Sequence, residues 1–463
     1  MPPVYESLFG VAGTAPERPC LLLDDGSTLT YGDLDGQAAR MAGALRSRGI
    51  RAGDRVVLVV GKSVEAVALY LACLRTGAVL VPLNTAYTAA EVGFFVDDAA
   101  AALVVDEATL AELSAGDPDP VVADRTGDDW AAMLYTSGTT GRSKGAMLSC
   151  RNLVTNARAL HDAWRFSPDD VLVHVLPVFH VHGLFVALHC AFLAGAAVRF
   201  HERFDPEHVR ADLRRSTVLM GVPTHYHRLL DQTDLDQTDC HGMRLFTSGS
   251  APLSASRHDE FAVRAGHRIV ERYGSTEAMI LTSNPYDGER VAGTVGFPLD
   301  GVELRISVGG VVETRTDGLF LGYWGQPEKT AASFTDDGWF VTGDLGALDT
   351  DGRLTLAGRE KDLIISGGLN VYPAEIEAVL DEVPGMVESA VVGEPDPDFG
   401  ERVVAFVVTD RPVDDAVLRR VCDAALARFK HPRRYVFVDE LPRNTMGKVQ
   451  KHRLRGRLHD ESG

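Results

Sequence analysis

The chain has 463 residues, of which 45% are apolar, so it is too long for one hydrophobic core and is expected to form two or three domains. Its net charge of −19 argues against nucleic acid or an anionic membrane as a partner, but not against small anionic substrates in a locally positive cleft. The six cysteines are scattered without a C-x-x-C pair, and no basic segment precedes an apolar run at the N-terminus. Both features predict a cytoplasmic chain with reduced thiols and no signal peptide.

The first half of the chain alternates strand-like and helix-like runs. A helix is expected from Thr30 to Leu45, because apolar residues recur there at intervals of three and four. Further strands are expected over 55–60, 79–82 and 131–134, and further helices over 64–76 and from Ser149 to about Trp164. A polar linker is expected over 118–129.

The same alternation continues to about residue 272. Strands are expected over 171–176, 198–200, 218–222, 244–248 and 268–272, and helices over 181–193, from Pro223 and over 255–265. The most apolar stretch, 183–198, is too short to span a bilayer and is expected to be a buried helix. Repeated strand–helix units predict mostly parallel, buried sheets with ligands at the carboxyl ends of the strands.

From Gly293 to Asp349 the pattern changes to short strands with many turns, and a charged segment follows near 358–362. We therefore predict an α/β protein with an α+β C-terminal lobe. The large N-terminal domain, residues 1–358, would contain stacked, mostly parallel sheets with helices and a small β-rich subdomain. The small C-terminal domain would cover residues 359–463.

A segment dense in hydroxyls, glycines and cations runs from Tyr135 to Gly145 (YTSGTTGRSKG). A strand before it and a helix after it would be the geometry that surrounds an anion with backbone N–H groups. An ordinary polar surface loop is the alternative interpretation. The spacing does not match a Walker A motif, so the segment would bind phosphates in a different way from a P-loop.

This segment resembles the AMP-binding signature of adenylate-forming enzymes, which include acyl-CoA and aryl-CoA synthetases, peptide-synthetase adenylation domains and firefly luciferase. The resemblance implies ATP as a substrate and Thr136 as a ligand of Mg²⁺. It also assigns phosphate contacts to Thr136, Ser137, Gly138, Thr139, Thr140 and Lys144.

A second motif is Tyr273-Gly274-Ser275-Thr276-Glu277, predicted to follow a strand. An aromatic ring, a hydroxyl and a carboxylate in one turn would suit a nucleobase, a phosphate and Mg²⁺, although a plain strand end with a turn glycine is the alternative. The motif is similar to the family's Tyr-Gly-x-Thr-Glu. The similarity implies adenine stacking for Tyr273, a catalytic role for Thr276, and metal binding and catalysis for Glu277.

Two further segments resemble loops of the family that surround the nucleotide. In 247–253 (TSGSAPL), Ser250 and Ala251 would lie beside the adenine, and Ser248 beside the acid. In 339–344 (WFVTGD), the resemblance assigns Asp344 to the ribose hydroxyls, with Arg359 nearby. A tight turn is the alternative for both segments.

A lysine near the C-terminus, Lys448, would by composition alone be expected on the protein surface. Lys448, in 442–448 (PRNTMGK), matches the family's catalytic lysine, which would bridge the acid carboxylate and the α-phosphate. The Gly367-Gly368 loop resembles the one that approaches the thiol of coenzyme A, and Lys361 matches the hinge position. The resemblance thus implies a mobile C-terminal domain that rotates between two half-reactions.

Two histidine pairs raise the question of a metal site: 180 with 182, and 225 with 227. Neither has a third ligand nearby in sequence, so we do not expect either pair to bind a metal. By resemblance His180 lies beside the acid pocket and takes part in catalysis. The basic run 428–434 could meet CoA phosphates, but a solvated surface or local packing is the stronger interpretation.

Several segments resemble malonyl-CoA and methylmalonyl-CoA synthetases, and this resemblance covers nearly the whole chain. The segments are 178–184, 221–228, 271–274, 283–290 and 444–451. Within that subfamily Arg272 would hold the non-reacting carboxylate of the acid; the alternative is an ion pair with Glu271 or another acid. The chain departs from the subfamily at Ser275, where Met is usual, and in a shortened segment over 307–316.

The sequence therefore predicts an ATP-dependent acid–CoA ligase that uses Mg²⁺ and coenzyme A and acts on malonate or methylmalonate. One alternative is an adenylating enzyme for an aryl, fatty or amino-aryl acid that passes its product to a carrier protein or another nucleophile. Another is a non-catalytic nucleotide-binding relative. No nucleic acid or membrane is expected as a partner.

Overall fold

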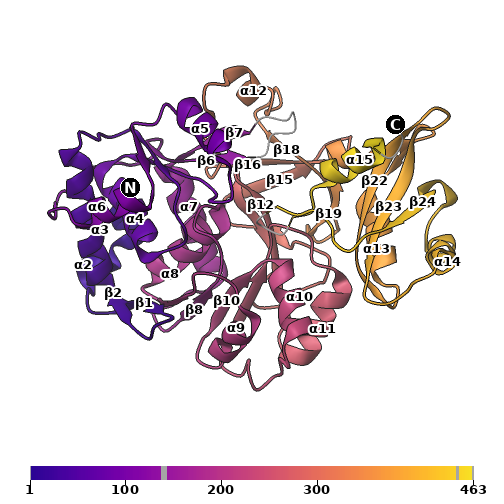
Figure 1. Ribbon diagram of the computed structural model, residues 1–463, viewed down its shortest axis with the longest axis horizontal. Coiled ribbons are helices and arrows are strands. Elements are labelled where there is room, and N and C mark those ends of the chain that lie inside the picture. Colours follow the sequence, from indigo (N-terminus) through magenta and orange to yellow (C-terminus); the bar gives the residue numbers. More distant parts are fainter. Residues whose placement is uncertain (1, 137–142, 445–447, 461–463) are drawn as a thin grey trace.

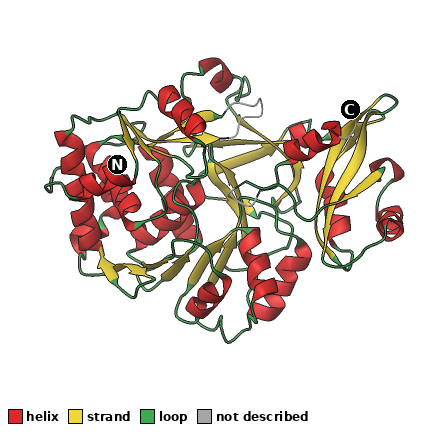
Figure 2. Cartoon of the chain, viewed as in Figure 1, coloured by secondary structure: helices red, strands yellow, loops and turns green. Residues whose placement is uncertain are grey.

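The computed structural model describes residues 2–136, 143–444 and 448–460. Within those ranges the strands form four sheets, of nine, six, four and five strands. Figure 1 shows three of them in one large lobe and the last in a smaller lobe near the C-terminus, and Figure 2 shows helices covering the outside of the sheets. The predicted α/β class, with a large N-terminal lobe, a small β-rich part and a small C-terminal lobe, is confirmed.

The largest sheet has the order β14-β13-β12-β11-β10-β8-β9-β1-β2. Its strands are β1 (Pro19–Leu23), β2 (Thr28–Thr30), β8 (Val171–His174), β9 (Ala197–Phe200), β10 (Val218–Gly221), β11 (Leu245–Ser248), β12 (Val270–Ser275), β13 (Met279–Ser283) and β14 (Phe297–Pro298). The strands from β12 across to β1 pair in parallel, whereas β2, β13 and β14 pair antiparallel at the two edges. The loops after β11 and β12, at one end of this sheet, carry much of the candidate site.

The second sheet has the order β17-β7-β6-β4-β3-β5, and the third has the order β15-β16-β18-β19. The second contains β3 (Arg55–Leu58), β4 (Val79–Pro82), β5 (Leu103–Val105), β6 (Trp130–Thr136), β7 (Lys144–Ser149) and β17 (Gly322–Tyr323). The third contains β15 (Val302–Ile306), β16 (Val311–Thr316), β18 (Phe340–Leu348) and β19 (Leu354–Arg359). The third is the predicted β-rich part.

Helices of the large lobe follow the capping and periodicity signals of the sequence. They are α1 (Val4–Phe9), α2 (Val11–Thr14), α3 (Tyr31–Ser47), α4 (Val64–Thr76), α5 (Ala89–Asp98), α6 (Glu107–Ser114), α7 (Cys150–Ala163), α8 (His189–Ala194), α9 (Pro206–Leu213), α10 (Pro223–Gln232), α11 (Ala255–Ala265) and α12 (Pro327–Ala331). Thr30 and Ser149 cap α3 and α7 by accepting the N–H group three residues on. The apolar run near 183–198 includes a buried π-helix, η1 (His182–Leu188), followed by α8.

The expected strand–loop–helix geometry around the phosphate segment was wrong. Lys144–Ser149 is a strand, β7, which pairs antiparallel with β6, and α7 begins only at Cys150. Six strand residues span about 20 Å, so the N-terminus of α7 lies far from the loop and contributes no backbone N–H groups to it. Any anion site there must use the hairpin and its side chains; residues 137–142 lie outside the described residues.

The smaller lobe follows β19 and the short 3₁₀-helix η2 (Glu360–Asp362). Its elements are β20 (Ile364–Ser366), β21 (Leu369–Val371), α13 (Pro373–Asp381), β22 (Met386–Asp396), β23 (Gly400–Thr409), α14 (Asp415–Ala425), η3 (Arg428–Lys430), β24 (Arg434–Phe437) and α15 (Lys451–Asp460). Two apolar clusters in this lobe draw only on residues from Ile364 onward. This supports the division expected between residues 358 and 359, which stays a prediction.

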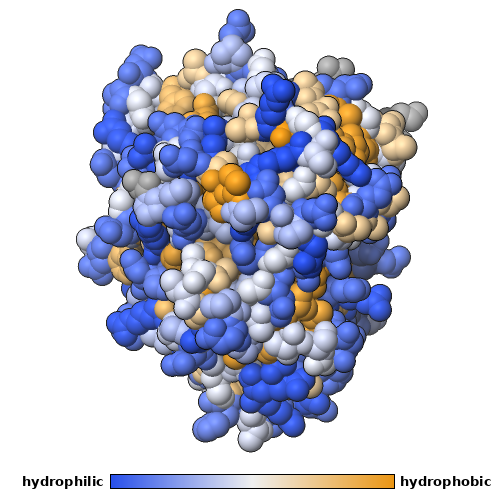
Figure 3. All heavy atoms as spheres, turned by 90° about the vertical axis from the view of Figure 1, so that its left-hand side faces the viewer, coloured by the Kyte–Doolittle hydropathy of each residue, from blue (hydrophilic) through white to orange (hydrophobic). Residues whose placement is uncertain are grey.

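The rest of the molecule agrees with an ordinary globular surface and interior. All six cysteines are buried and unbridged. The face that carries the N-terminal helices is mostly hydrophilic, with apolar side chains in small separate groups (Figure 3). Among the described residues, no helix is both long and apolar enough to cross a membrane.

Candidate active site

One end of the candidate site is a cluster around Glu277. Glu277 lies in the turn between β12 and β13, next to Thr276. Its Oε1 accepts hydrogen bonds from the hydroxyls of Thr136 (3.4 Å) and Tyr323 (3.0 Å). Lys144 Nζ lies 4.6 Å from the centre of the Tyr323 ring. The structure therefore brings Thr136, Lys144 and Glu277 together as predicted, and adds Tyr323, which no sequence motif indicated.

The donor set at this end suits a hard cation. A carboxylate and hydroxyls are present, and no thiol or imidazole belongs to the contacts of Glu277 among the described residues. Mg²⁺ prefers such oxygen ligands and takes the others from phosphates and water. The residues thus fit Mg²⁺ held with a polyphosphate. Ser137, Gly138, Thr139 and Thr140, predicted to contact the same phosphates, lie outside the described residues.

A second cluster joins Tyr273 to the third sheet. The Tyr273 hydroxyl donates to Asp344 Oδ2 at 2.7 Å, and Arg359 Nε lies 2.9 Å from Asp344 Oδ1. Burial, followed by the charge of Asp344, raises the pKa of Tyr273 well above its usual value, so the phenol stays protonated and donates. Asp344 retains lone pairs on both oxygens that could accept hydroxyl groups. The three residues predicted at the adenosine therefore lie together, with Tyr273 tied to Asp344 by its hydroxyl.

A third cluster surrounds Arg272, whose side chain is buried in the large lobe at 5% relative exposure. Its Nε and Nη2 have no hydrogen-bond partner, and no carboxylate among the described residues forms an ion pair with it. The alternative pairing with Glu271 is therefore wrong: successive residues of β12 point to opposite faces, and Glu271 instead accepts from the Gly293 N–H at 3.3 Å. Burial lowers the pKa of Arg272 only to about 10, so the guanidinium remains charged at neutral pH.

Other buried residues around Arg272 also have unpartnered polar atoms: two precede Gly249, which Arg272 packs against, and one is His182, whose pKa the charge of Arg272 affects. They are Ser248 Oγ, Thr247 Oγ1 and both ring nitrogens of His182. Burial, followed by the charge of Arg272, lowers the pKa of His180 to about 4 and of His182 well below its usual value, so both rings are neutral. Buried polar groups are nearly always paired in a folded protein. Unpartnered polar groups around an unpaired cation therefore indicate a candidate binding site for an anionic ligand, called the Arg272 pocket below.

Gly249 makes room for the arginine. A Cβ atom at Gly249 would lie 2.5 Å from Arg272 Cζ. A glycine at this position is therefore needed because the guanidinium itself packs against the loop. The next residue, Ser250, has φ of +70°, an unusual conformation for a residue with a side chain, and half-buried Ala251 follows it.

Lys448 in the smaller lobe lies close to these clusters. Desolvation of its ammonium group, followed by the charge of Arg359, lowers the pKa of Lys448 to about 8, and Asp344 and Lys361 also act on it. Its charge is felt by His180 as well. Lys448 is therefore near enough to Asp344, Arg359 and His180 for their charges to interact, and the residue as a whole is exposed. Lys361, the predicted hinge residue, is in η2, where burial and Arg359 lower its pKa.

The Gly367-Gly368 loop is not brought into the same site. Both glycines have positive φ, at +59° and +76°, and form the two-residue turn between β20 and β21. Gly367 donates to the Phe399 carbonyl oxygen within the smaller lobe. The turn geometry explains the glycines, and their predicted contact with coenzyme A stays a prediction that requires another arrangement of the lobes.

The comparisons with known proteins agree with this geometry. The family of AMP-binding enzymes matches residues 8–324, and the C-terminal domain of AMP-binding enzymes matches residues 375–448. The chain belongs to the AMP-binding enzyme family. Most of the candidate site lies inside these two matches, with Asp344 and Arg359 between them.

Known relatives and solved structures align with nearly the whole length of this chain. A malonate–CoA ligase of Arabidopsis thaliana is 32% identical over 99% of this chain and 89% of its own length, and a sulfoacetate–CoA ligase of Cupriavidus necator is 33% identical over 98% of each. The crystal structure of ATP-bound MatB from Rhodopseudomonas palustris is 45% identical, covers 100% of both chains and has a TM-score of 0.96. The apo structure of the same protein gives a TM-score of 0.84, so the present structure as a whole is more similar to the ATP-bound form.

We expect Gly249→Ala to weaken use of the anionic acid by about tenfold in kcat/KM, because the new methyl group displaces the Arg272 guanidinium. The measurement is steady-state kinetics with the preferred acid, alongside the KM for ATP. Gly242→Ala is a matched control, since its Cβ would meet no atom closer than 3.4 Å. An equal loss in both variants would contradict a specific effect on Arg272.

Proposed function

We propose that this protein is an ATP-dependent acid–CoA ligase that acts on malonate or a 2-substituted malonate such as methylmalonate. The carboxylate of the acid attacks the α-phosphate of ATP, and pyrophosphate leaves. The thiol of coenzyme A then attacks the acyl carbon of the adenylate, and AMP leaves. Kinship with malonate–CoA ligases and with ATP-bound MatB supports this activity.

The observation that carries the choice of acid is the buried, unpaired guanidinium of Arg272. A cation buried without a counter-ion is costly, and a carboxylate is its natural bidentate partner. A monocarboxylic acid has only the carboxylate that must react with ATP, so it leaves Arg272 unpaired. An acid with a second anionic group satisfies both requirements at once.

Each cluster then has a separate task. Thr136, Lys144 and Glu277 would hold the phosphates, and Mg²⁺ bound there would neutralise their charge. Tyr273, Asp344 and Arg359 would hold the adenosine, with Ser250 and Ala251 beside the adenine. Ser248 and neutral His180 would line the acid pocket. Lys448 would place its ammonium between the attacking carboxylate and the α-phosphate, where negative charge develops.

A sulfonate in place of the second carboxylate is the nearest alternative, because it would also pair with Arg272, and one relative is a sulfoacetate–CoA ligase. Ser275 could adapt the pocket, since this half-buried residue replaces the usual Met and its hydroxyl accepts from the Ala278 N–H. Pyrophosphate exchange over malonate, methylmalonate, sulfoacetate, butyrate and benzoate would rank these acids. The same panel with coenzyme A or a carrier protein would identify the acceptor.

Arg272→Ala should lower kcat/KM for malonate by about 100-fold to 1,000-fold, since it removes the partner of a buried carboxylate. Butyrate has no such carboxylate, so its kcat/KM should change by less than about threefold. For malonate, the kcat/KM of Arg272→Lys should lie between those of the unsubstituted protein and Arg272→Ala, because lysine keeps the charge but loses the bidentate geometry. Parallel losses for both acids would remove Arg272 from the proposed role.

Lys448→Ala should reduce malonate-dependent pyrophosphate exchange by at least about 100-fold, because it removes the ammonium that we place at the α-phosphate. The same variant should retain most of its rate of malonyl-CoA formation from supplied malonyl-adenylate. Lys430→Ala, which removes a lysine paired with Glu375 in the smaller lobe, is the control. A comparable loss of both half-reactions in Lys448→Ala would contradict a role for Lys448 in adenylation alone.

The adenylation step should lose rate as the pH rises through about 8. The lowered pKa of Lys448 means that its ammonium deprotonates in that range, and the neutral amine cannot neutralise developing charge. In Lys448→Arg the residual activity should show no decline near pH 8, because a guanidinium stays protonated. The measurement is kcat/KM for malonate in pyrophosphate exchange from pH 6 to 9.5. If kcat/KM of Lys448→Arg fell above pH 8 as it does in the unsubstituted protein, the decline would arise from another titrating group.

A further inference from the structure

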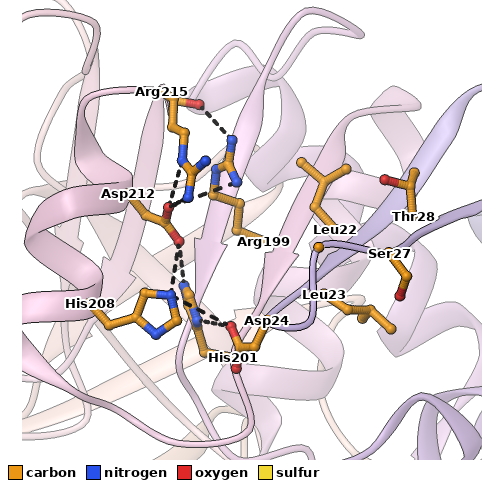
Figure 4. Close-up of a pocket in the computed structure, with 11 residues that line it drawn as sticks. Leu22, Leu23, Asp24, Ser27, Thr28, Arg199, His201, His208, Asp212 and Arg215 are labelled. Carbon is orange, nitrogen blue, oxygen red and sulfur yellow. Dashed lines mark hydrogen bonds and ion pairs between the residues drawn. The ribbon is translucent and has the colours of Figure 1, made fainter.

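A polar pocket lies at the far edge of the large sheet, and none of its lining residues belongs to the candidate active site. Four of these residues, Asp24, His201, His208 and Asp212, point toward one another in Figure 4. The cavity holds about 250 Å³. His201 and Asp212 are buried at its base, whereas Asp24 and His208 lie at the rim, with 42% and 45% of their side-chain surfaces exposed.

The fold itself brings these residues together. β1 and β9 run in parallel with Leu23 opposite Phe200, so Asp24 and His201 are the next residues at the ends of two neighbouring strands. His208 and Asp212 are four residues apart on α9 and therefore share one face of that helix. The cluster thus joins three segments that are distant in the sequence, which is why no local motif announces it.

Two carboxylates, those of Asp24 and Asp212, flank the imidazole of His201, and this arrangement favours a cation beside the ring. His201 Nδ1 lies 2.6 Å from Asp24 Oδ1, and His201 Nε2 lies 3.0 Å from Asp212 Oδ2. A neutral imidazole carries one proton, so it can donate to only one of these carboxylates. The contact with Asp24 is a hydrogen bond, whereas Nε2 is buried and has no hydrogen-bond partner. A lone pair of Nε2 then faces a carboxylate oxygen, unless a proton or a metal ion lies between them.

One oxygen of Asp212 is paired with arginine side chains. Arg215 and Arg199 lie on Oδ1, at 2.5 and 3.8 Å. The other oxygen, Oδ2, therefore faces the histidines: His201 Nε2 at 3.0 Å and His208 Nε2 at 4.0 Å.

We propose that Asp24, His201, His208 and Asp212 form a binding site for a divalent transition-metal ion of the zinc class. The ion is bound by Nε2 of His201, Nε2 of His208 and Oδ2 of Asp212. Asp212 Oδ2 lies 3.0 Å from His201 Nε2 and 4.0 Å from His208 Nε2, so a rotation of the rim residue His208 would bring its nitrogen closer to the other two ligand atoms. Asp24 accepts from Nδ1 and orients His201, the usual role of a carboxylate behind a metal-binding histidine.

The donor set determines which ions fit. Two imidazoles and a carboxylate suit Zn²⁺ and similar transition metals, whereas Mg²⁺ prefers oxygen ligands and water. The ion at this site is therefore distinct from Mg²⁺ at the Glu277 cluster. Because it links β1, β9 and α9, its expected effect is on the stability of this edge of the sheet.

Calorimetric titration of the full-length protein with Zn²⁺ in excess Mg²⁺, which occupies oxygen-only sites, tests the proposal. We expect one Zn²⁺ per chain and a rise in the melting temperature. Because His208 lies at the rim, His208→Ala should fold normally and bind Zn²⁺ at least tenfold more weakly, with no rise in melting temperature. His161→Ala, which removes a half-buried histidine paired with Asp162, is the matched control and should bind as the unsubstituted protein does.

Co²⁺ provides a spectroscopic readout that does not depend on stability. Imidazole-bound Co²⁺ should give visible absorption bands in the unsubstituted protein and in His161→Ala, and these should weaken in His208→Ala and Asp212→Asn. Absence of stoichiometric Zn²⁺ binding, or equal binding in His208→Ala and the unsubstituted protein, would overturn the proposal.

Discussion

The charge of Arg272, buried without a counter-ion, is the constraint on which the candidate site depends. The guanidinium lies behind the loop that follows β11, with 5% of its surface exposed and two of its nitrogens unpartnered. Burying a charge in this way costs several kcal/mol unless a ligand supplies the opposite charge. The chain bears that cost at the carboxyl end of the sheet, where Gly249 leaves the space and neutral histidines add no competing positive charge.

The other clusters are arranged around this pocket by strand ends. β12 carries Arg272 and Tyr273 on opposite faces, so one side chain reaches the acid pocket and the next reaches Asp344 in the third sheet. The turn after β12 carries Glu277 to the hairpin of β6 and β7. A single short segment therefore contacts all three parts of the site, and its backbone fixes their separation.

The two lobes divide the chemistry. The large lobe contains the Arg272 pocket, the Asp344 cluster and the Glu277 cluster, whereas Lys448 comes from the smaller lobe and already feels the charges of Asp344 and Arg359. The structure as a whole has a higher TM-score to ATP-bound MatB than to its apo form. The Gly367-Gly368 turn takes no part in the three clusters, because Gly367 donates to Phe399 within the smaller lobe.

The sequence by itself determined the local features. Periodicity and capping residues placed helices such as Val64–Thr76 and Ala255–Ala265, and the family motifs identified Thr136, Lys144, Tyr273, Glu277, Asp344 and Lys448. These signals are local, since a helix cap or a signature loop is written in consecutive residues. Where the local pattern was ambiguous, as in Lys144–Ser149, the sequence suggested a loop leading to a helix and missed a strand that only its pairing with β6 defines.

Only the tertiary structure decided which distant side chains meet. In the folded chain, Tyr323 donates a hydrogen bond to Glu277, and Asp24 contacts His201, which is 177 positions away in the sequence. Among the described residues, Arg272 has no carboxylate partner, although Glu271 precedes it in the sequence. Such contacts depend on strand order and register, which a single sequence does not encode in any short segment. Burial decided the charges in the same way: the neutral state of His180 and the lowered pKa of Lys448 arise from desolvation by residues far away in the chain.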